Sequence, residues 1–554
     1  MSRQRFVLPA LLAMAQAALA QQPPAGGQLL QIPPTPAAPR AAPEIRIQQQ
    51  AAPAAEGQDS AKITVRALRI TGAHVYSESE LLELTGFRPG SELSLSELRS
   101  MADRITAYYR AHGYFVALAW LPAQEVTDNV VTISVSEGQY RNITVNNSTT
   151  VSDRLIRSDL EGINSGDPIL TAPLESRLLV LSDLPGVNVR STLVPGASIG
   201  SSDLIVDVTP GQRISGSVDA DNAGNPYTGE VRVGATLNVN NPLGLGDVAS
   251  LRLLTSGKGL RYGRASYQLQ VGRGQVGVAY SRLDYHLDKQ FESLDANGTA
   301  EIASVFGRYP LIRSRNSNLY LQLAYDAKTF QDRIDSTGAV TDKKAQVWMT
   351  SLYGEHRDMV GGGGLNSYAL TWSSGTIDIR TPEALAADAA TARSNGHFDK
   401  LSFNAMRLQT LGGRFWLYGA VSGQAAFKNL DVSEKMELGG MNGVRAYPEG
   451  EAYADEGYLL TLEGRMQLAR FTGRMPGDLQ LIAFVDTGGV RINHDPWTPA
   501  DNRRTLSGAG VGLNWSDPGN FMVRAYYAVK VGSEKATSSP DKSGRFWIQA
   551  VKYF

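Results

Sequence analysis

A serine framed by glycines is the first candidate for catalysis in this chain. Gly196-Ala197-Ser198-Ile199-Gly200 matches the Gly-x-Ser-x-Gly pattern of serine hydrolases. That chemistry needs a sharp strand-to-helix turn, with a histidine and an acid close to the serine. Here the pattern lies in a predicted hairpin between two strands. We therefore interpret it as a chance match and predict that the chain is not an enzyme.

Metal, cofactor and nucleotide sites also lack their usual residue patterns. The six histidines are scattered, without a His-Glu-x-x-His spacing, and the chain has no cysteine. Gly257-Lys258-Gly259 lacks the remainder of a phosphate-binding loop. The formal net charge of −1 gives no electrostatic reason to expect nucleic acid as a partner. We predict no metal, no cofactor and no nucleic-acid partner.

Two segments near the C-terminal end combine charges with glycines. One is a glycine-rich stretch with Gly443, Val444, Arg445, Ala446 and Tyr447 at its centre, followed by Glu463 and Arg465. The other is Phe484-Val485-Asp486-Thr487-Gly488. A guanidinium and a carboxylate in a confined interior stabilise each other, because an unpaired charge there is costly. The alternative is that Arg445 is a solvated loop arginine and Asp486 one of several interior acids.

Alternating polarity indicates that the second segment is a β-strand. In the run Leu479-Gln480-Leu481-Ile482-Ala483-Phe484-Val485-Asp486, Leu481 and Val485 face one side and Gln480 and Asp486 the other. The same alternation places Phe484, Asp486 and Gly488 on one face. One side of such a strand can meet lipid while the other meets a wet interior.

The links between sixteen such segments alternate between short and long. The short links are Asn241–Asp247, Gly272–Gln275, Arg313–Asn316, Gly361–Asn366, Leu411–Arg414, Phe471–Gly477 and Asp517–Asn520. On the other side, two shorter links near 224–229 and 256–261 precede Lys289–Thr299, Gln331–Lys344, Thr381–Gly396, Leu438–Glu456, Asn493–Arg503 and Gly532–Gly544. Transmembrane barrels have short periplasmic turns and long outer loops. We predict that residues 213–554 form a transmembrane β-barrel of sixteen antiparallel strands, with about ten residues per crossing.

The N-terminal region carries a targeting signal. Arg3 and Arg5 precede an apolar stretch, and Ala18-Leu19-Ala20 fits a cleavage site, so residues 1–20 are predicted to be a signal peptide. Residues 21–60 are rich in Pro, Ala and Gln and are predicted to be a linker, in which only Gly27–Ile32 could start a short helix. A signal peptide before a barrel predicts the outer membrane of a double-membraned bacterium.

An internal duplication fills residues 61–139 and 140–212. The first copy is predicted as strand 63–70, helices 77–84 and 95–112, and strands 115–121 and 130–135. The second is predicted as strand 141–145, helices 152–160 and 172–184, and strands 187–194 and 204–208. Each copy is thus a small α+β module of βααββ order. Its short sheet leaves an edge that an extended peptide can join as an added strand. The alternative is a pair of rigid spacers without a ligand.

Two βααββ modules before a sixteen-stranded barrel resemble the POTRA domains and pore of the two-partner secretion transporters. This TpsB family (the ShlB/FhaC/HecB type) includes the haemolysin-activator and filamentous-haemagglutinin transporters, and is related to BamA. Val444-Arg445-Ala446-Tyr447 is similar to the family's Val-Arg-Gly-Tyr loop motif, with Ala446 where glycine is usual. Alanine lacks the freedom of glycine at positive φ, so the loop tip either avoids that conformation or is slightly strained. Phe484–Gly488 is similar to the family's Phe-x-Asp-x-Gly strand motif.

The resemblance implies that the loop folds back into the pore and that Arg445 meets Asp486. Glu463 and Arg465 are then supporting lumen charges, and Gly488 leaves room for the loop's backbone. Many family members also place an N-terminal helix in the pore as a plug. The proline density of Ile32–Pro43 leaves little room for a full-length helix, so we expect a short plug or none.

The function implied by the resemblance is protein export without nucleotide. The POTRA modules, in the periplasm, would recognise an unfolded secreted partner of the TpsA type, which is an adhesin, a haemolysin or a toxin. The partner would then thread the outer-membrane barrel and fold outside. Outer-membrane lipid and the barrel-assembly machinery are further expected partners. Two alternatives are an insertase like BamA or TamA, which usually carries more modules, and a passive porin, which has no use for tandem modules.

Overall fold

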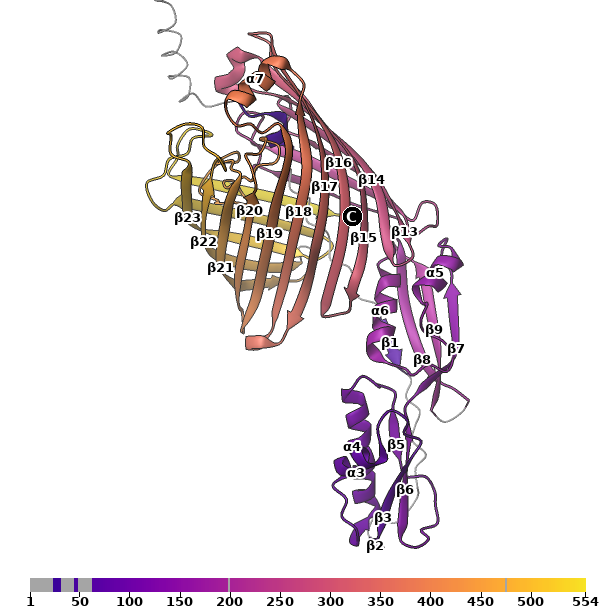
Figure 1. Cartoon of the computed structure of the whole chain (residues 1–554). Helices are drawn as coiled ribbons and strands as arrows, with labels where there is room; N and C mark the ends of the chain where they lie inside the picture. Colours follow the sequence, from indigo (N-terminus) through magenta and orange to yellow (C-terminus); the bar gives the residue numbers. More distant parts are fainter. Residues whose placement is uncertain (1–22, 31–43, 48–61, 198–199, 474–475) are drawn as a thin grey trace, which may run out of the picture.

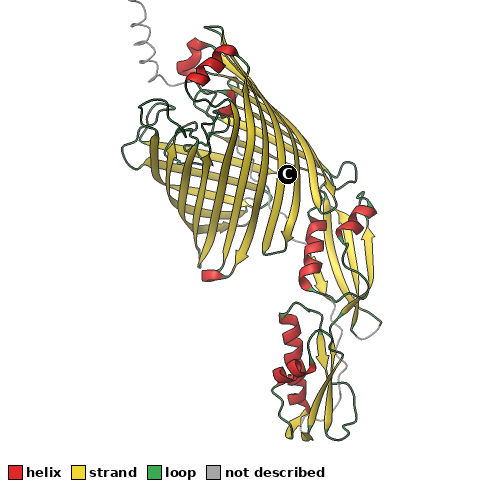
Figure 2. Ribbon diagram, in the orientation of Figure 1, coloured by secondary structure: helices red, strands yellow, loops and turns green. Residues whose placement is uncertain are grey.

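The chain forms two small modules that follow one another below a wide barrel (Figure 1). The structure is a computed structural model that describes residues 23–30, 44–47, 62–197, 200–473 and 476–554. The predicted signal peptide and Ser198 of the Gly-x-Ser-x-Gly pattern lie outside these residues. Helices gather in the two modules and near the rims, whereas the wall of the barrel consists of strands (Figure 2).

The first module has both predicted helices but a different sheet from the one expected. Its elements are β2 (Lys62–Val65), β3 (Ala67–Thr71), α3 (Glu78–Thr85), β4 (Ser91–Ser94), α4 (Leu95–Ala111), β5 (Leu118–Trp120) and β6 (Val130–Ser136). The predicted first strand is broken at Arg66, whose N–H donates to the Asn129 carbonyl (2.8 Å). β2 then pairs with β4, which was not predicted because Leu93 is its one buried residue. The main sheet has the order β3-β6-β5.

The second module has all five predicted elements and one more strand. Its own elements are β7 (Gln139–Asn147), α5 (Asp153–Asp159), α6 (Thr171–Ser182), β8 (Val187–Pro195) and β9 (Ser201–Pro210). The sheet has the order β1-β8-β9-β7. The added strand β1 (Glu44–Ile47) comes from the predicted linker and pairs in parallel with residues 190–193 of β8. The edge of β8 is therefore occupied by another part of the same chain.

The barrel confirms the predicted fold class, with sixteen antiparallel strands in sequence order. The strands are β10 (Ile214–Asp221), β11 (Arg232–Asn240), β12 (Val248–Thr255), β13 (Leu260–Val271), β14 (Gly274–His286), β15 (Ala296–Arg313), β16 (Ser317–Ile334), β17 (Ala339–Asp358), β18 (Gly364–Ile379), β19 (Gly396–Gly412), β20 (Phe415–Ala426), β21 (Glu456–Phe471), β22 (Gly477–Arg491), β23 (Arg503–Asp517), β24 (Phe521–Lys530) and β25 (Gly544–Tyr553). β25 closes the barrel onto β10 through five residue pairs, from Ser217 with Tyr553 to Asp221 with Gln549.

The links are short at the end next to the modules and mostly long at the other end. The outer links hold a 3₁₀ helix, η1 (Lys289–Leu294), and α7 (Pro382–Ala390), while η2 (Val360–Gly362) lies in a periplasmic turn. One predicted long link, Gln331–Lys344, is wrong. β16 continues to Ile334 and β17 begins at Ala339, so only residues 335–338 form the turn. Polar residues occupy both faces of this stretch. On the inner face, Asp332 accepts a hydrogen bond from Gly26 and Lys343 pairs with Asp431, so the alternation of polarity that marks a strand is lost.

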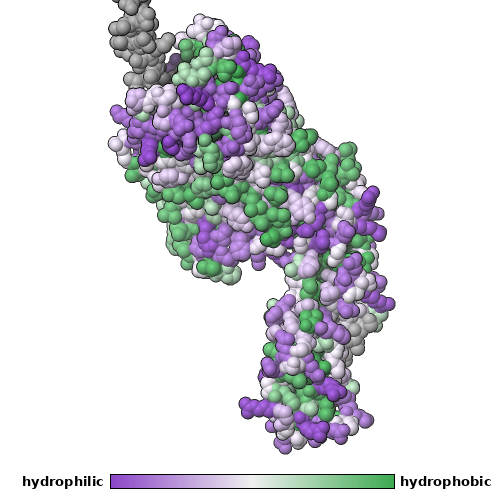
Figure 3. Space-filling view, in the orientation of Figure 1, coloured by the Kyte–Doolittle hydropathy of each residue, from purple (hydrophilic) through white to green (hydrophobic). Residues whose placement is uncertain are grey.

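The two faces of the wall differ as the alternation predicts. On β22, Val485 is 51% exposed on the outer surface, whereas its neighbours Phe484 and Asp486 are buried inside. Apolar residues form a band across the face of the barrel seen in Figure 3, with hydrophilic residues gathered above it. No helix within the described ranges is long and apolar enough to cross a bilayer.

A short N-terminal helix lies inside the barrel. This helix, α2 (Gly26–Leu29), contacts β14, β15 and β16. Leu29 is buried in a cluster with inward-facing residues such as Leu283 and Phe330. The helix has four residues.

Candidate functional site in the barrel pore

The link between β20 and β21, residues 427–455, folds back into the pore and begins earlier than the predicted start at Leu438. We call this segment the pore loop and residues 443–447 its tip. Val444, Ala446 and Tyr447 of the tip are all at most 1% exposed. They pack in a cluster with Phe484 on β22 and Tyr526 on β24. The tip is therefore fixed against the inner face of the wall rather than projecting into solvent.

The guanidinium of Arg445 forms a two-pronged pair with the carboxylate of Asp486. Its Nε and Nη2 donate to the two carboxylate oxygens, each at 2.8 Å, and the Arg445 backbone N–H also donates to Oδ2 at 3.2 Å. Asp486 is fully buried and Arg445 is 4% exposed. Thr461 on β21 donates a further hydrogen bond to Asp486 Oδ1 at 3.0 Å. A pair with this planar geometry fixes the position of the loop as well as its charge.

Glu463 and Arg465 extend this pair along β21. Nη1 of Arg445 donates to Glu463 Oε1 at 2.8 Å, and Arg465 donates to Glu463 Oε2 from Nη2 (2.6 Å) and Nε (2.9 Å). Glu463 is 4% exposed. The charges therefore form one continuous chain, Asp486–Arg445–Glu463–Arg465, in which signs alternate and only Arg465 is partly exposed. Removing Arg445 leaves Asp486 buried without its cation, which is strongly destabilising.

Aromatic rings enclose the Arg445 guanidinium. Its Cζ lies 3.4 Å from the centre of the Phe484 ring and 4.9 Å from that of Tyr526. The two rings meet edge to face at 5.8 Å. Such contacts stabilise a desolvated cation. Tyr526 was missed by the sequence analysis, because nothing in β24 distinguishes it from other inward-facing aromatic residues.

Small residues allow the close approach of loop and wall. A Cβ on Gly443 would collide with the carbonyl oxygens of Leu438 and Gly439, so this turn requires glycine. Gly488 was expected to leave room for the loop's backbone. Instead, it makes room for the side chain of Leu438. Ala446 is not at positive φ, so the tip avoids the strained conformation. Its methyl group would lie only 2.5 Å from a Cβ at position 508, where the chain has glycine.

Further contacts of the loop were not predicted. The Tyr447 hydroxyl donates to the Glu534 carbonyl at 3.0 Å. The carboxylate of Glu451 accepts hydrogen bonds from Thr537 and Ser538 and pairs with Arg504 at 2.6 Å. These contacts join the loop to the link between β24 and β25 and, through Arg504, to β23. They connect segments far apart in the sequence and have no local motif.

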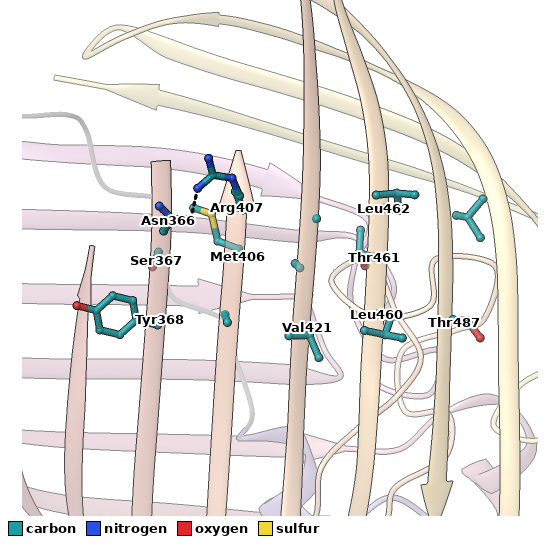
Figure 4. A pocket seen from close by; sticks show the side chains of 14 residues that line it. Asn366, Ser367, Tyr368, Met406, Arg407, Val421, Leu460, Thr461, Leu462 and Thr487 are labelled. Atoms are coloured by element: carbon teal, nitrogen blue, oxygen red, sulfur yellow. Dashed lines mark hydrogen bonds between the residues drawn. The ribbon is translucent and has the colours of Figure 1, made fainter. Parts of the chain in front are cut away.

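The outer wall behind the site is apolar. A depression of about 770 Å³ spans β18 to β22, with Tyr368, Val421, Leu460, Leu462 and Thr487 among its lining residues (Figure 4). One polar group at its margin is Arg407, which donates to Asn366 Oδ1 at 2.7 Å. Thus β21 and β22 direct Glu463, Arg465 and Asp486 into the pore, while Leu460, Leu462 and Thr487 on the same strands line the outer depression.

A closed sixteen-stranded barrel with a loop fixed in its pore, preceded by two α+β modules, defines a POTRA–barrel protein of the bacterial outer membrane. Two family models match the chain. One, described as haemolysin secretion/activation protein ShlB/FhaC/HecB, matches residues 200–515, and the other, described as POTRA domain, ShlB-type, matches residues 63–138. The chain belongs to the ShlB/FhaC/HecB family of haemolysin secretion/activation proteins. This confirms the predicted family.

Individual proteins show the same likeness. The heme/hemopexin transporter protein HuxB of Haemophilus influenzae strain 86-028NP is 29% identical over 84% of this chain and 82% of HuxB. The outer membrane transporter CdiB of Dickeya dadantii is 24% identical over 81% of this chain and 80% of CdiB. The solved structure of CdiB from Escherichia coli has a TM-score of 0.67 at 20% identity, covering 92% of this chain and 93% of that one. BamA from Haemophilus ducreyi, lacking POTRA domains 1–3, has a TM-score of 0.52 at 15% identity, covering 89% and 100%.

Proposed function

We propose that this chain exports one large secreted partner of the TpsA type from the periplasm to the cell surface. The observation that carries the proposal is the pore loop, which is fixed across the pore by the Arg445–Asp486 pair. In a passive porin such a loop would only obstruct flow, whereas in an exporter it keeps the idle pore closed. Membership of the family supports the same function.

We propose a separate role for each segment of the chain, in sequence order. Residues 21–60 form the linker with the short plug, residues 61–139 and 140–212 are two periplasmic POTRA domains, and residues 213–554 are the barrel. Outer-membrane lipid covers the apolar band, including the depression behind the pore site. The barrel-assembly machinery inserts the barrel, as for other strand-built outer-membrane proteins.

The second POTRA domain offers a recognition surface for the partner. β1 pairs with β8 through residues 44–47, so this edge accepts an extended segment in parallel. We infer that an unfolded segment of the partner adds to the same edge after β1 leaves it. Main-chain hydrogen bonds then provide affinity, and the alternate side chains of β8 provide selectivity.

Export proceeds without a nucleotide in this proposal. Displacing the pore loop and α2 opens a path through the barrel. Folding of the partner outside the cell then supplies the direction, because a folded domain does not return through the pore. The insertase alternative has the likeness to BamA in its favour, but at 15% identity this concerns the fold alone.

A deletion strain tests the function. We expect one very large protein to vanish from the culture medium and to reappear on expression of this chain. A general loss of outer-membrane barrel proteins, with an unchanged medium, would support the insertase instead.

A further inference from the structure

The first limb of the pore loop, residues 427–434, is held to the wall by a second set of buried ion pairs. Lys343 on β17 pairs with Asp431 at 2.9 Å. Lys328 on β16 and Lys400 on β19 both pair with Glu434, at 2.6 and 2.9 Å. Whereas the tip meets β21 and β22, these lysines come from a different arc of the barrel. The loop therefore has two separate attachments.

The two carboxylates of this second attachment stay ionised at neutral pH, whereas burial lowers the pKa of Lys400. Burial alone would raise the pKa of both carboxyl groups, but the opposing charge of Lys343 lowers the pKa of Asp431 overall. Lys328 and Lys400 likewise bring the pKa of Glu434 down to about 2. Each of the five side chains has at most 13% exposure. Buried, ionised and paired groups of this kind fix geometry, because separating them is costly.

The N-terminal segment rests on this attached limb. A Cβ on Gly27 of α2 would lie 2.5 Å from the Cβ of Ser433, so backbone and side chain are in direct contact. The Ser433 N–H donates to Asp431 Oδ1 at 3.0 Å, which ties that contact to Lys343.

The opposite side of α2 meets the wall. The Gly26 N–H donates to Asp332 Oδ1 on β16 at 2.9 Å. Leu29 shares a buried cluster with Leu430 of the pore loop and with residues of the wall. The helix thus lies between the wall and the limb that the lysines hold.

We propose that Lys328, Lys343 and Lys400 are positioning residues that hold the first limb of the pore loop as the seat of α2. The seat is independent of the Arg445–Asp486 pair. The proposal goes beyond the export function, because it assigns the plug and the loop tip to separate attachments that can be released one at a time. It also assigns a binding partner, residues 23–30 of the same chain, to a surface inside the pore.

Cysteine cross-linking tests this assignment, because the chain has no cysteine of its own. A Cβ on Gly26 would lie 3.4 Å from the Cβ of Ala300, close to the separation found in disulfides. In the Gly26→Cys/Ala300→Cys protein, we expect Lys343→Met to slow cross-linking about tenfold or more, since it leaves Asp431 buried and unpaired. The pore should also conduct more current in planar bilayers. The matched control is Arg282→Met, which removes a cation from an exposed ion pair.

Two results would overturn the proposal. One is equal cross-linking rates in Lys343→Met and Arg282→Met. The other is a loss of cross-linking in Arg445→Lys as large as in Lys343→Met, because the seat would then depend on the tip.

A variant without any charge change guards against failed barrel folding. Gly27→Ala alters no barrel residue, yet its methyl group collides with Ser433. We expect higher conductance from Gly27→Ala and a partial return toward wild-type conductance from Gly27→Ala/Ser433→Gly, because the Cα of residue 433 still lies 2.9 Å from the added methyl group. Unchanged conductance in Gly27→Ala would contradict the proposed seat.

Discussion

The indole Nε1–H of Trp547 donates a hydrogen bond to the backbone carbonyl of Arg445 at 2.7 Å. Trp547 is 4% exposed and lies on β25, the strand that closes the barrel. The loop tip therefore touches the seam between β25 and β10, which is joined by five residue pairs. One hydrogen bond thus connects the tip of the pore loop to β25, the strand that closes the barrel.

Replacing Trp547 by phenylalanine should loosen the tip. The change keeps most of the apolar contact but leaves the Arg445 carbonyl without its donor, which costs about 1–3 kcal/mol at a buried site. We expect faster hydrogen exchange at residues 443–447 and a larger mean conductance. Trp515→Phe is the matched control, because the Trp515 Nε1 has no hydrogen-bond partner among the described residues. Equal effects of the two variants would contradict the assigned role.

Ala446 and Gly508 should behave as a complementary pair. A Cβ on Gly508 would lie 2.5 Å from the Cβ of Ala446, so Gly508→Ala forces the tip away from the wall. Overpacking of this kind typically costs about 1–3 kcal/mol. We expect Gly508→Ala to raise conductance and protease cleavage within the pore loop. Adding Ala446→Gly to the Gly508→Ala variant should reverse both effects. A failure of this rescue would show that the collision is not with the tip.

The edge of β8 should become available when β1 is prevented from pairing. Proline has no N–H to donate, and neighbouring residues of a strand direct their N–H groups to opposite sides. Ile45→Pro/Arg46→Pro therefore removes a bond to β8 whichever residue provides it. We expect the N-terminal domain of the secreted partner to bind this variant more tightly in a titration with purified protein. Unchanged or weaker binding would place recognition elsewhere.

Asp159 should make the second POTRA domain less stable as pH rises. It is fully buried, and its carboxylate oxygens have no hydrogen-bond partner in the described part of the chain. Burial raises its pKa from 3.8 to about 7, although the nearby charges of Arg177 and Arg273 lower it in part. The folded domain therefore holds a proton that the unfolded chain has lost, so stability falls between about pH 4 and pH 7.

Asp159→Asn should abolish this slope. Each unit of pKa shift corresponds to about 1.4 kcal/mol, so the variant should be more stable at pH 8 by on the order of a few kcal/mol. Hydrogen exchange in α5 of the whole protein in detergent measures the change. Glu161→Gln, an exposed carboxylate nearby, is the control. A wild-type protein with the same exchange protection at pH 5 and pH 8 would contradict the prediction.

The period of two along a strand explains why the barrel could be predicted from the sequence. Val485 and Asp486 are neighbours in the chain, yet the backbone directs one to the exterior and the other into the pore. The same rule failed for Gln331–Lys344, where the inward-facing Asp332 and Lys343 are polar because they bind other parts of the chain inside the barrel, so the polarity does not alternate. β4 was missed for a similar reason, since one buried leucine does not make a pattern.

Contacts between distant segments account for the parts of the site that could not be predicted. The family motifs named Arg445 and Asp486, but nothing local points from Trp547 to a carbonyl 102 residues away. The pairing of β1 with β8 and of Lys343 with Asp431 likewise depends on the folded shape of the chain.

The secretion of the partner by charge-reversed variants tests the central claim most directly. Arg445→Glu and Asp486→Arg should each lower the amount of partner in the medium while folded barrel is still recovered from the outer membrane. The double variant should restore secretion in part, because Glu463 and Arg465 still favour the original signs. Normal secretion by Arg445→Glu would contradict the claim that this ion pair fixes the pore loop for export.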